Sequence, residues 1–264
     1  MSFADVNGQR IHYEDSGGSG PVLAFSHGLL MDGSMWAPQV AALSDRYRCI
    51  TWDERGHGQT ESDGTSFSYW DSGADLIALL GRLGVERATL IGMSQGGYLT
   101  QRAAVTAPAL VQALVFVASS SRPEDPDKAG LYNAMLETWE RDGLGDDLAQ
   151  AVATIILGAG WEGSSAWIEK WRARDRLSMR ANLEALLGRE DFTARLGELD
   201  FPALVIWGDQ DLAISSEYAH ELADGLPQGR LEVVAGAGHG VNLTDPQQTN
   251  RALEAFLASL PATS

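Results

Sequence analysis

The chain of 264 residues is long enough for one large α/β domain, and 44% of its residues are hydrophobic, which is sufficient for an extensive core. Its 36 acidic and 19 basic side chains give a formal net charge of −17, which repels nucleic acid and anionic membranes, so neither is an expected partner. No stretch is long and apolar enough to cross a membrane, and residues 1–20 lack the apolar run of a secretory signal. Cys49 is the only cysteine and lies in an apolar strand pattern, so we expect no internal disulfide. Together with the missing secretory signal, this leads us to expect a cytoplasmic protein.

The expected elements alternate between strands and helices along most of the chain. Asn7-Gly8 separates two strand-like runs, which predicts a hairpin turn. Further strand patterns lie at 22–26, 48–52, 88–93, 111–118, 203–207 and 231–234. Helix patterns lie at 37–44, 67–83, 94–107, 215–225 and 246–259. This alternation predicts a doubly wound, mostly parallel eight-stranded sheet with a ligand crevice at the carboxyl ends of its strands.

Residues 122–198 interrupt the alternation, because their pattern is helical throughout and is punctuated by glycines. We expect this segment to form a helical cap inserted between two strands of the core. The chain then divides into a first core part at 1–121, the cap at 122–198 and a second core part at 199–264.

The most informative motif is Gly92-Met93-Ser94-Gln95-Gly96, which lies between a strand pattern and a helix pattern. A serine on such a strand-to-helix turn is a candidate nucleophile, because the sharp turn exposes its hydroxyl group. Only very small residues fit two positions before and after it, where Gly92 and Gly96 lie. The following helix directs its free N–H groups and positive dipole end at charge that develops near Ser94. The alternative role for Ser94 is that of an ordinary helix N-cap.

A serine nucleophile needs a general base and an acid that orients the base. His239 follows the strand pattern at 231–234 and is the candidate base. Asp209 and Asp211 both follow the strand pattern at 203–207, and each is a candidate acid.

A rival position for the acid follows the strand pattern at 111–118. Glu124 and Asp125 lie there. Their neighbours Pro123 and Pro126 are typical of a surface loop and favour the later acid instead.

Backbone N–H groups that bind the oxyanion complete a site of this kind. The strand pattern at 22–26 is followed by His27-Gly28-Leu29-Leu30, where the glycine permits a turn. We expect the Leu29 N–H to join the Gln95 N–H in an oxyanion hole.

Together these motifs resemble the α/β-hydrolase superfamily. The resemblance covers the chain outside residues 122–198 and rests on the His27-Gly28 turn, Trp36, residues 53–58, the serine turn, residues 208–211, Gly238-His239 and Asp245-Pro246. The chain order Ser94, Asp211, His239 is that of the superfamily's catalytic triad. The superfamily's acid matches the last position of 208–211, and the resemblance therefore favours Asp211 over Asp209.

Within the superfamily the chain is most similar to the branch of 3-oxoadipate enol-lactonases, cofactor-free haloperoxidases or perhydrolases, and small carboxylesterases. Ser94 disfavours epoxide hydrolase and haloalkane dehalogenase activity, since those enzymes carry an aspartate nucleophile. Gln95 is a departure, because enol-lactonases and haloperoxidases usually have methionine after the nucleophile.

The resemblance implies a serine hydrolase that needs no cofactor or metal and acts on a small-molecule carboxylic ester or lactone. Perhydrolysis and C–C bond hydrolysis with the same triad are alternative activities. A ligand-sensing protein with little turnover is an alternative of another class.

The other four histidines are expected to have environments unrelated to catalysis. His12 lies in an edge-strand pattern and His220 on a polar helix face, so both are expected to be solvated. His27 and His57 lie in turns, where structural hydrogen bonds are the expected role.

Four of the chain's eight tryptophans lie in the cap, at Trp139, Trp161, Trp167 and Trp171. We expect most of them to pack the cap against the core. Because a cap lies over the serine, the four are also candidate substrate-binding residues, of which one or two line an apolar pocket.

Arg172, Arg176 and Arg180 are spaced one helical turn apart, in a pattern that would suit a carboxylate clamp. Glu169 and Glu184 lie three and four residues from the ends of this stripe, a spacing typical of a solvated, ion-paired face. We therefore expect surface ion pairs here and a preferred substrate that is uncharged and apolar on its acyl side.

Overall fold

The computed structural model describes residues 2–61, 64–174 and 178–261, in which eight strands form one sheet in the order β1-β2-β4-β3-β5-β6-β7-β8. The strands are β1 (Ser2–Val6), β2 (Gln9–Asp15), β3 (Val22–Ser26), β4 (Arg48–Trp52), β5 (Ala88–Met93), β6 (Val111–Val117), β7 (Pro202–Gly208) and β8 (Gln228–Val234). The β1–β2 and β2–β4 pairs are antiparallel and all other neighbours are parallel. The predicted mostly parallel, doubly wound sheet is therefore confirmed.

The burial of the central strands explains why they could be predicted from the sequence. All six residues of β5 are buried, as expected for a parallel strand covered by helices on both faces. The edge strand β8 is buried only at Val234 and is longer than its apolar pattern predicted. At the other edge, Asn7 and Gly8 have φ values of 48° and 77°, which fit the tight hairpin turn expected there.

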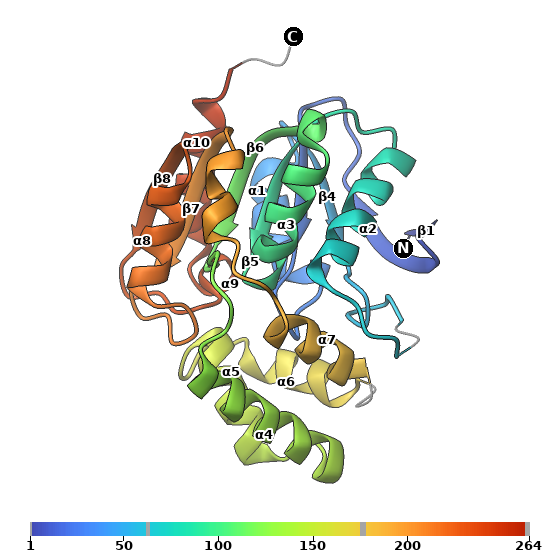
Figure 1. Ribbon diagram of the computed structural model, residues 1–264, viewed down its shortest axis with the longest axis vertical. Coiled ribbons are helices and arrows are strands. Elements are labelled where there is room, and N and C mark those ends of the chain that lie inside the picture. The colour runs from blue at the N-terminus through green and yellow to red at the C-terminus, as the bar shows by residue number, and fades with distance from the viewer. Residues whose placement is uncertain (1, 62–63, 175–177, 262–264) are drawn as a thin grey trace.

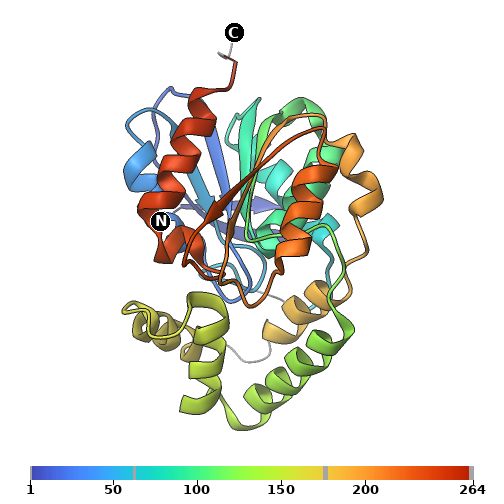
Figure 2. The same ribbon diagram turned by 90° about the vertical axis from the view of Figure 1, so that its left-hand side faces the viewer.

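Helices cover both faces of the sheet (Figures 1 and 2). Helices α2 (Tyr69–Arg82), α3 (Gln95–Thr106) and α8 (Ser216–Gly225) cover one face, while α1 (Ala37–Leu43) and α10 (Pro246–Ala258) cover the other, next to the short α9 (Val241–Thr244). Helix α2 begins two residues later than predicted, because Ser68 and Asp71 form a capping box that fixes its first turn.

The inserted segment forms four helices beyond the carboxyl ends of the strands, at the bottom of both views (Figures 1 and 2). They are α4 (Pro126–Asp142), α5 (Asp146–Leu157), α6 (Ser164–Arg172) and α7 (Ser178–Leu187), and they lie in the chain between β6 and β7. Gly143 and Gly158, with φ values of 88° and 82°, end α4 and α5. The division into core and cap at residues 122 and 198 stays a prediction.

Two predictions from composition also concern the fold. Cys49 is a free thiol with 2% of its surface exposed, and it packs in the core as a small hydrophobic residue. Among the residues that the structure describes, no helix has the length and apolar character needed to span a bilayer.

Candidate active site

Ser94 lies at the turn between β5 and α3 with backbone angles φ 50° and ψ −114°, a conformation that a residue with a side chain rarely adopts. The flanking glycines make the turn possible. A Cβ atom at Gly92 would lie 2.2 Å from the Gly96 carbonyl oxygen, and one at Gly96 would lie 2.2 Å from the Ser26 carbonyl oxygen. Both contacts are with backbone, so neither can be relieved by a side-chain rotation.

We expect Gly96→Ala to destabilise the protein by about 1–3 kcal/mol, because the added methyl group forces β3 and α3 apart. Thermal unfolding should show a Tm lower than that of the parent by about 2–10 °C. The matched control is Gly130→Ala, since a Cβ at Gly130 in α4 meets no atom within 4 Å. A Gly96→Ala protein as stable as the Gly130→Ala protein would show that the close contact between residue 96 and the Ser26 carbonyl is not required for stability.

His239 and Asp211 form the second part of the site. His239 Nδ1 lies 2.9 Å from Asp211 Oδ2, and the Asp211 side chain is fully buried. Asp211 Oδ1 accepts hydrogen bonds from the backbone N–H groups of Ala213, at 2.8 Å, and Ile214, at 2.9 Å. These bonds fix the carboxylate, and the carboxylate in turn leaves His239 Nε2 free to act as a base.

The three rival acids bond other groups: Asp209 Oδ1 accepts from the Gly236 N–H at 2.8 Å, Glu124 pairs with Arg189, and Asp125 caps α4. Among the described residues, the structure brings only Asp211 of these four acids into hydrogen-bond contact with His239.

Ser94 and His239 line one cavity. Among the described residues no hydrogen bond joins the Ser94 hydroxyl group to His239 Nε2. Catalytic contacts of this kind often tighten only when substrate binds.

The backbone around Leu29 faces the serine turn. A Cβ atom at Gly28 would lie 3.6 Å from Ser94 Cβ, so the two loops are in contact. The N–H groups of Leu29 and Gln95 form no hydrogen bond with any described residue, and the Gln95 N–H belongs to the first turn of α3. Both groups are therefore available to an oxyanion.

The loop is held in place by its next residue, Leu30, which has a φ of 66°. The Leu30 N–H donates to His57 Nε2 at 3.3 Å, and the Leu30 carbonyl accepts from the Trp171 indole N–H at 2.9 Å. A residue of the cap thus fixes the conformation of the candidate oxyanion loop.

The structural roles predicted for His27 and His57 are confirmed. His27 Nε2 accepts from the Glu54 N–H at 3.0 Å, and the Nδ1 atoms of the two rings contact the carbonyl oxygens of Gly28 and Arg55. Burial lowers the pKa of both imidazoles, because a buried ring loses the hydration of its charged form. Both rings are therefore neutral at pH 7, and their hydrogen bonds support the loop at residues 28–30.

The environments predicted for the two remaining histidines differ in outcome. His220 is exposed on α8, as expected. The expectation for His12 is wrong: its exposed fraction is 5%, and its Nδ1 lies 2.8 Å from Asp53 Oδ2. The turn after β4 folds over β2, and Gln59 closes the other side of the ring at 3.1 Å. The sequence around His12 does not show that residues more than 40 positions later in the chain cover its ring.

The shared cavity has a volume of ≈ 120 Å³ and is lined mainly by apolar side chains from the cap helices α4, α5 and α7. Its polar lining residues are Ser94, His239, Tyr98, Tyr132 and Glu124. The last three were not singled out as lining residues from the sequence, because neither α3 nor α4 with the loop before it carries a pattern that shows which side chains face the cavity.

Only Trp139 of the four cap tryptophans lines this cavity among the described residues. The structure places the other three outside the lining of this cavity, in line with the expectation that one or two would line it. Trp171 is fully buried and bonds Leu30, Trp167 stacks under the Lys170 ammonium group at 4.2 Å, and Trp161 packs against Gly163. Trp171 thus joins the cap to the core, as expected, whereas the contacts given for Trp167 and Trp161 lie within the cap, although both rings pack in or against the main hydrophobic cluster.

The arginines do not form a continuous stripe, because α6 ends at Arg172 and α7 begins at Ser178. Arg172 pairs with Glu169 at 3.0 Å and also with Asp146. Arg180 pairs with Glu140 rather than with Glu184. Arg172 and Arg180 therefore form surface ion pairs, as expected, although with partly different partners. Arg176 lies outside the described residues.

The described parts of the chain contain no group of three or more His, Cys, Asp or Glu side chains arranged to hold a metal ion.

Comparisons with known proteins agree with this geometry. The family model described as "alpha/beta hydrolase fold" matches residues 21–246. The chain is 30% identical to "Putative carbamate hydrolase RutD" of Agrobacterium fabrum, over 96% of this chain and 99% of that protein. It is 30% identical to 3-oxoadipate enol-lactonase 2 of Acinetobacter baylyi, over 90% and 88% of the two chains. The crystal structure of the enol-lactonase from Burkholderia xenovorans superposes with a TM-score of 0.90 at 27% identity, covering 98% of this chain and 100% of the other. The chain therefore belongs to the α/β-hydrolase fold family.

Proposed function

We propose that this α/β hydrolase cleaves carboxylic esters or lactones through an acyl-enzyme intermediate. The observation that carries the proposal is that Ser94, on a strained turn, and His239, fixed by Asp211, line the same apolar cavity. This is the arrangement of nucleophile, base and orienting acid that acyl transfer requires.

In the proposed first step, the Ser94 hydroxyl oxygen attacks the acyl carbon while its proton passes to His239 Nε2. The oxyanion that forms is bound by the N–H groups of Leu29 and Gln95. The imidazolium is stabilised by Asp211, and it then protonates the departing alkoxide as the bond from the acyl carbon to that oxygen breaks.

In the second step, water attacks the acyl group on Ser94. His239 takes a proton from the water and returns it to the Ser94 oxygen as the carboxylic acid leaves. A lactone follows the same steps, except that its leaving oxygen stays attached to the acyl chain.

Hydrolysis of p-nitrophenyl acetate and butyrate tests the proposal. Sustained turnover supports an esterase, whereas a single burst of p-nitrophenol with no further release supports a ligand-sensing protein. A panel of alkyl esters, lactones, carbamates, β-diketones and hydrogen peroxide with a carboxylic acid then compares the acyl-transfer chemistries. Faster reaction of a β-diketone or of peroxide than of every ester and lactone would overturn the assignment.

The proposed substrate is uncharged and apolar on its acyl side. The cavity lining is mainly apolar, and the two described arginines of the predicted stripe are occupied by surface carboxylates. The net charge of −17 also slows the approach of anions.

We expect kcat/KM for methyl hexanoate to exceed that for monomethyl adipate by about tenfold or more at low ionic strength. The ratio should fall when salt screens the long-range repulsion, while some preference remains because the cavity desolvates the acyl chain. Steady-state assays of the two esters at low and high salt measure both effects. A carboxylate ester preferred at both salt concentrations would contradict this, and Arg176→Ala would then be the first variant to examine.

A further inference from the structure

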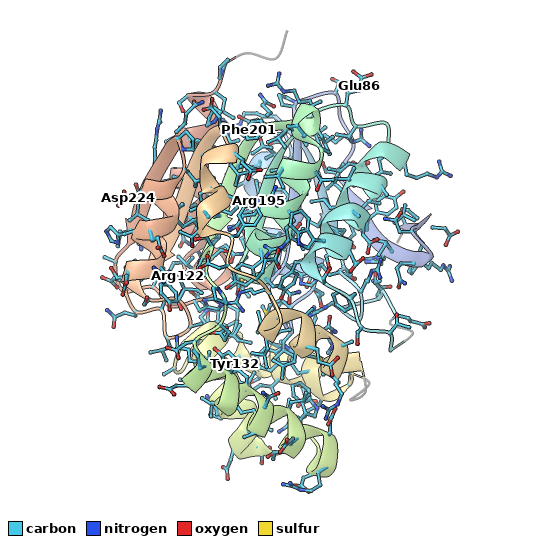
Figure 3. All side chains as sticks on the ribbon, viewed as in Figure 1. Glu86, Arg122, Tyr132, Arg195, Phe201 and Asp224 are labelled. Atoms are coloured by element: carbon cyan, nitrogen blue, oxygen red, sulfur yellow. The ribbon has the colours of Figure 1, made fainter. Side chains whose placement is uncertain are left out.

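Glu124, Tyr98 and Tyr132 form a polar wall of the cavity, and apart from Ser94 and His239 its other described lining residues are apolar. Glu124 lies at the passage from β6 into the cap helix α4, and it is the only carboxyl side chain among the described lining residues. Its side chain has 11% of its surface exposed. Figure 3 labels Arg122 at this passage and Tyr132 on α4 below it.

Glu124 is held by a buried arginine. The Arg189 side chain has 2% of its surface exposed, and its Nη1 and Nη2 atoms each lie 3.3 Å from Glu124 Oε2. Arg189 is itself fixed, because it donates to the carbonyl oxygens of Arg122, at 3.0 Å, and Leu186, at 2.6 Å. Its guanidinium also lies 4.3 Å from the centre of the Tyr98 ring. The carboxylate at this wall therefore has a defined position.

Arg189 does not line the cavity among the described residues, whereas Glu124 does, so the charge that faces the cavity is that of Glu124. From the residues that the structure describes, the other carboxylate oxygen, Oε1, receives only a 3.3 Å contact from the Asp125 N–H. A carboxylate can accept about four hydrogen bonds, so Glu124 retains capacity for a donor on the substrate.

Tyr132 supplies a hydroxyl group near the same wall. No hydrogen bond joins this hydroxyl to another described residue. Burial raises the pKa of Tyr132, and the nearby charge of Glu124 raises it further. The phenol therefore stays protonated at neutral pH, and the wall combines a fixed acceptor with a hydroxyl that can donate or accept.

We propose that Glu124 is a specificity-determining residue that selects acyl chains ending in a hydroxyl group and rejects chains ending in a carboxylate. This rests on the proposed function of the Ser94 site and narrows its substrate class to uncharged acyl chains that are apolar except for a terminal hydroxyl group. A substrate hydroxyl donates to Glu124 and accepts from Tyr132. A substrate carboxylate in the cavity would lie next to the Glu124 carboxylate, because Glu124 lines the cavity and Arg189 does not. Two like charges in a poorly hydrated cavity repel each other strongly.

Three methyl esters that differ only at the end of the acyl chain test the proposal: hexanoate, 6-hydroxyhexanoate and adipate with one carboxyl group free. We expect the parent to prefer the hydroxy ester to the carboxylate ester. Glu124→Gln should shrink this ratio of kcat/KM by about tenfold to a hundredfold, mainly through KM. Asp125→Asn is the matched control, because it removes a neighbouring charge that does not line the cavity while an Asn can still cap α4. Its ratio should equal that of the parent.

Glu124→Asp separates charge from shape, since it keeps the charge on a shorter side chain. It should continue to reject the carboxylate ester, whereas Glu124→Ala, which removes the charge, serves in place of Glu124→Gln if that variant folds poorly. Loss of rejection in Glu124→Asp as well as in Glu124→Gln, or an unchanged ratio in Glu124→Gln, would overturn the proposal.

Binding measurements keep this test independent of turnover. In a Ser94→Ala background the three esters can be titrated by calorimetry, with and without Glu124→Gln. A parent that hydrolyses none of the esters contradicts the proposed function, yet the Kd ratios still report on Glu124. Equal Kd ratios with and without Glu124→Gln contradict the role of Glu124, even if the parent is an active esterase.

Discussion

Replacing Ser94 with alanine is expected to lower kcat/KM for ester hydrolysis by on the order of 10⁴-fold or more, because the variant lacks the oxygen proposed to attack the acyl carbon. Residual turnover should reflect only the proposed oxyanion hole and substrate binding, which the substitution leaves in place. Steady-state assays with p-nitrophenyl butyrate measure the loss. Activity within tenfold of the parent would show that Ser94 is not the nucleophile.

The fold should survive this substitution, because Ser94 is held by its backbone. Its N–H donates to the Val117 carbonyl at 2.9 Å, and its carbonyl accepts from the Gly97 N–H at 2.9 Å and from the Ser119 hydroxyl at 2.8 Å. No hydrogen bond of the Ser94 hydroxyl with a described residue is lost. A Tm close to that of the parent would therefore assign the lost activity to chemistry rather than to unfolding.

The elements nearest Ser94 were predictable because the sequence patterns that specify them lie within a few residues of the elements themselves. The β5 strand is a continuous apolar run, and it lies where predicted, at Ala88–Met93. The two glycines beside Ser94 are required by contacts with the backbone of the same turn and of β3, so their spacing alone indicates the turn. Asp211 and His239 were likewise each predicted to follow a strand, and the structure shows that these strands, β7 and β8, are adjacent and parallel.

The parts that were not predictable depend on residues distant in the chain. Trp171 bonds Leu30, which lies 141 positions earlier, and the ring of His12 is covered by Asp53 and Gln59. Glu124 was considered only as a rival acid, because two flanking prolines indicated a surface loop. Its partner Arg189 lies beyond the four cap helices, and only the folded cap brings the two together at the cavity wall.

The largest remaining effect is expected for Asp211→Asn, which should lower kcat by about 10⁴-fold. In the parent, Asp211 accepts the Nδ1 proton of His239 at 2.9 Å and leaves Nε2 as the base. An asparagine whose amide N–H₂ group faces the ring holds the tautomer with its proton on Nε2, which cannot accept the Ser94 proton. It also provides no negative charge to stabilise the imidazolium.

Asp209→Asn is the matched control, because it makes the same chemical change two residues earlier on a side chain that is exposed and contacts Gly236 rather than His239. The amide oxygen of the variant can still accept from the Gly236 N–H, so we expect kcat to change by no more than about threefold, in line with the small effects of surface substitutions. Measuring kcat for both variants with one neutral ester decides between the two acids. If Asp209→Asn is the slower variant, the acid that serves His239 during turnover is Asp209, and the loop after β7 must rearrange when substrate binds.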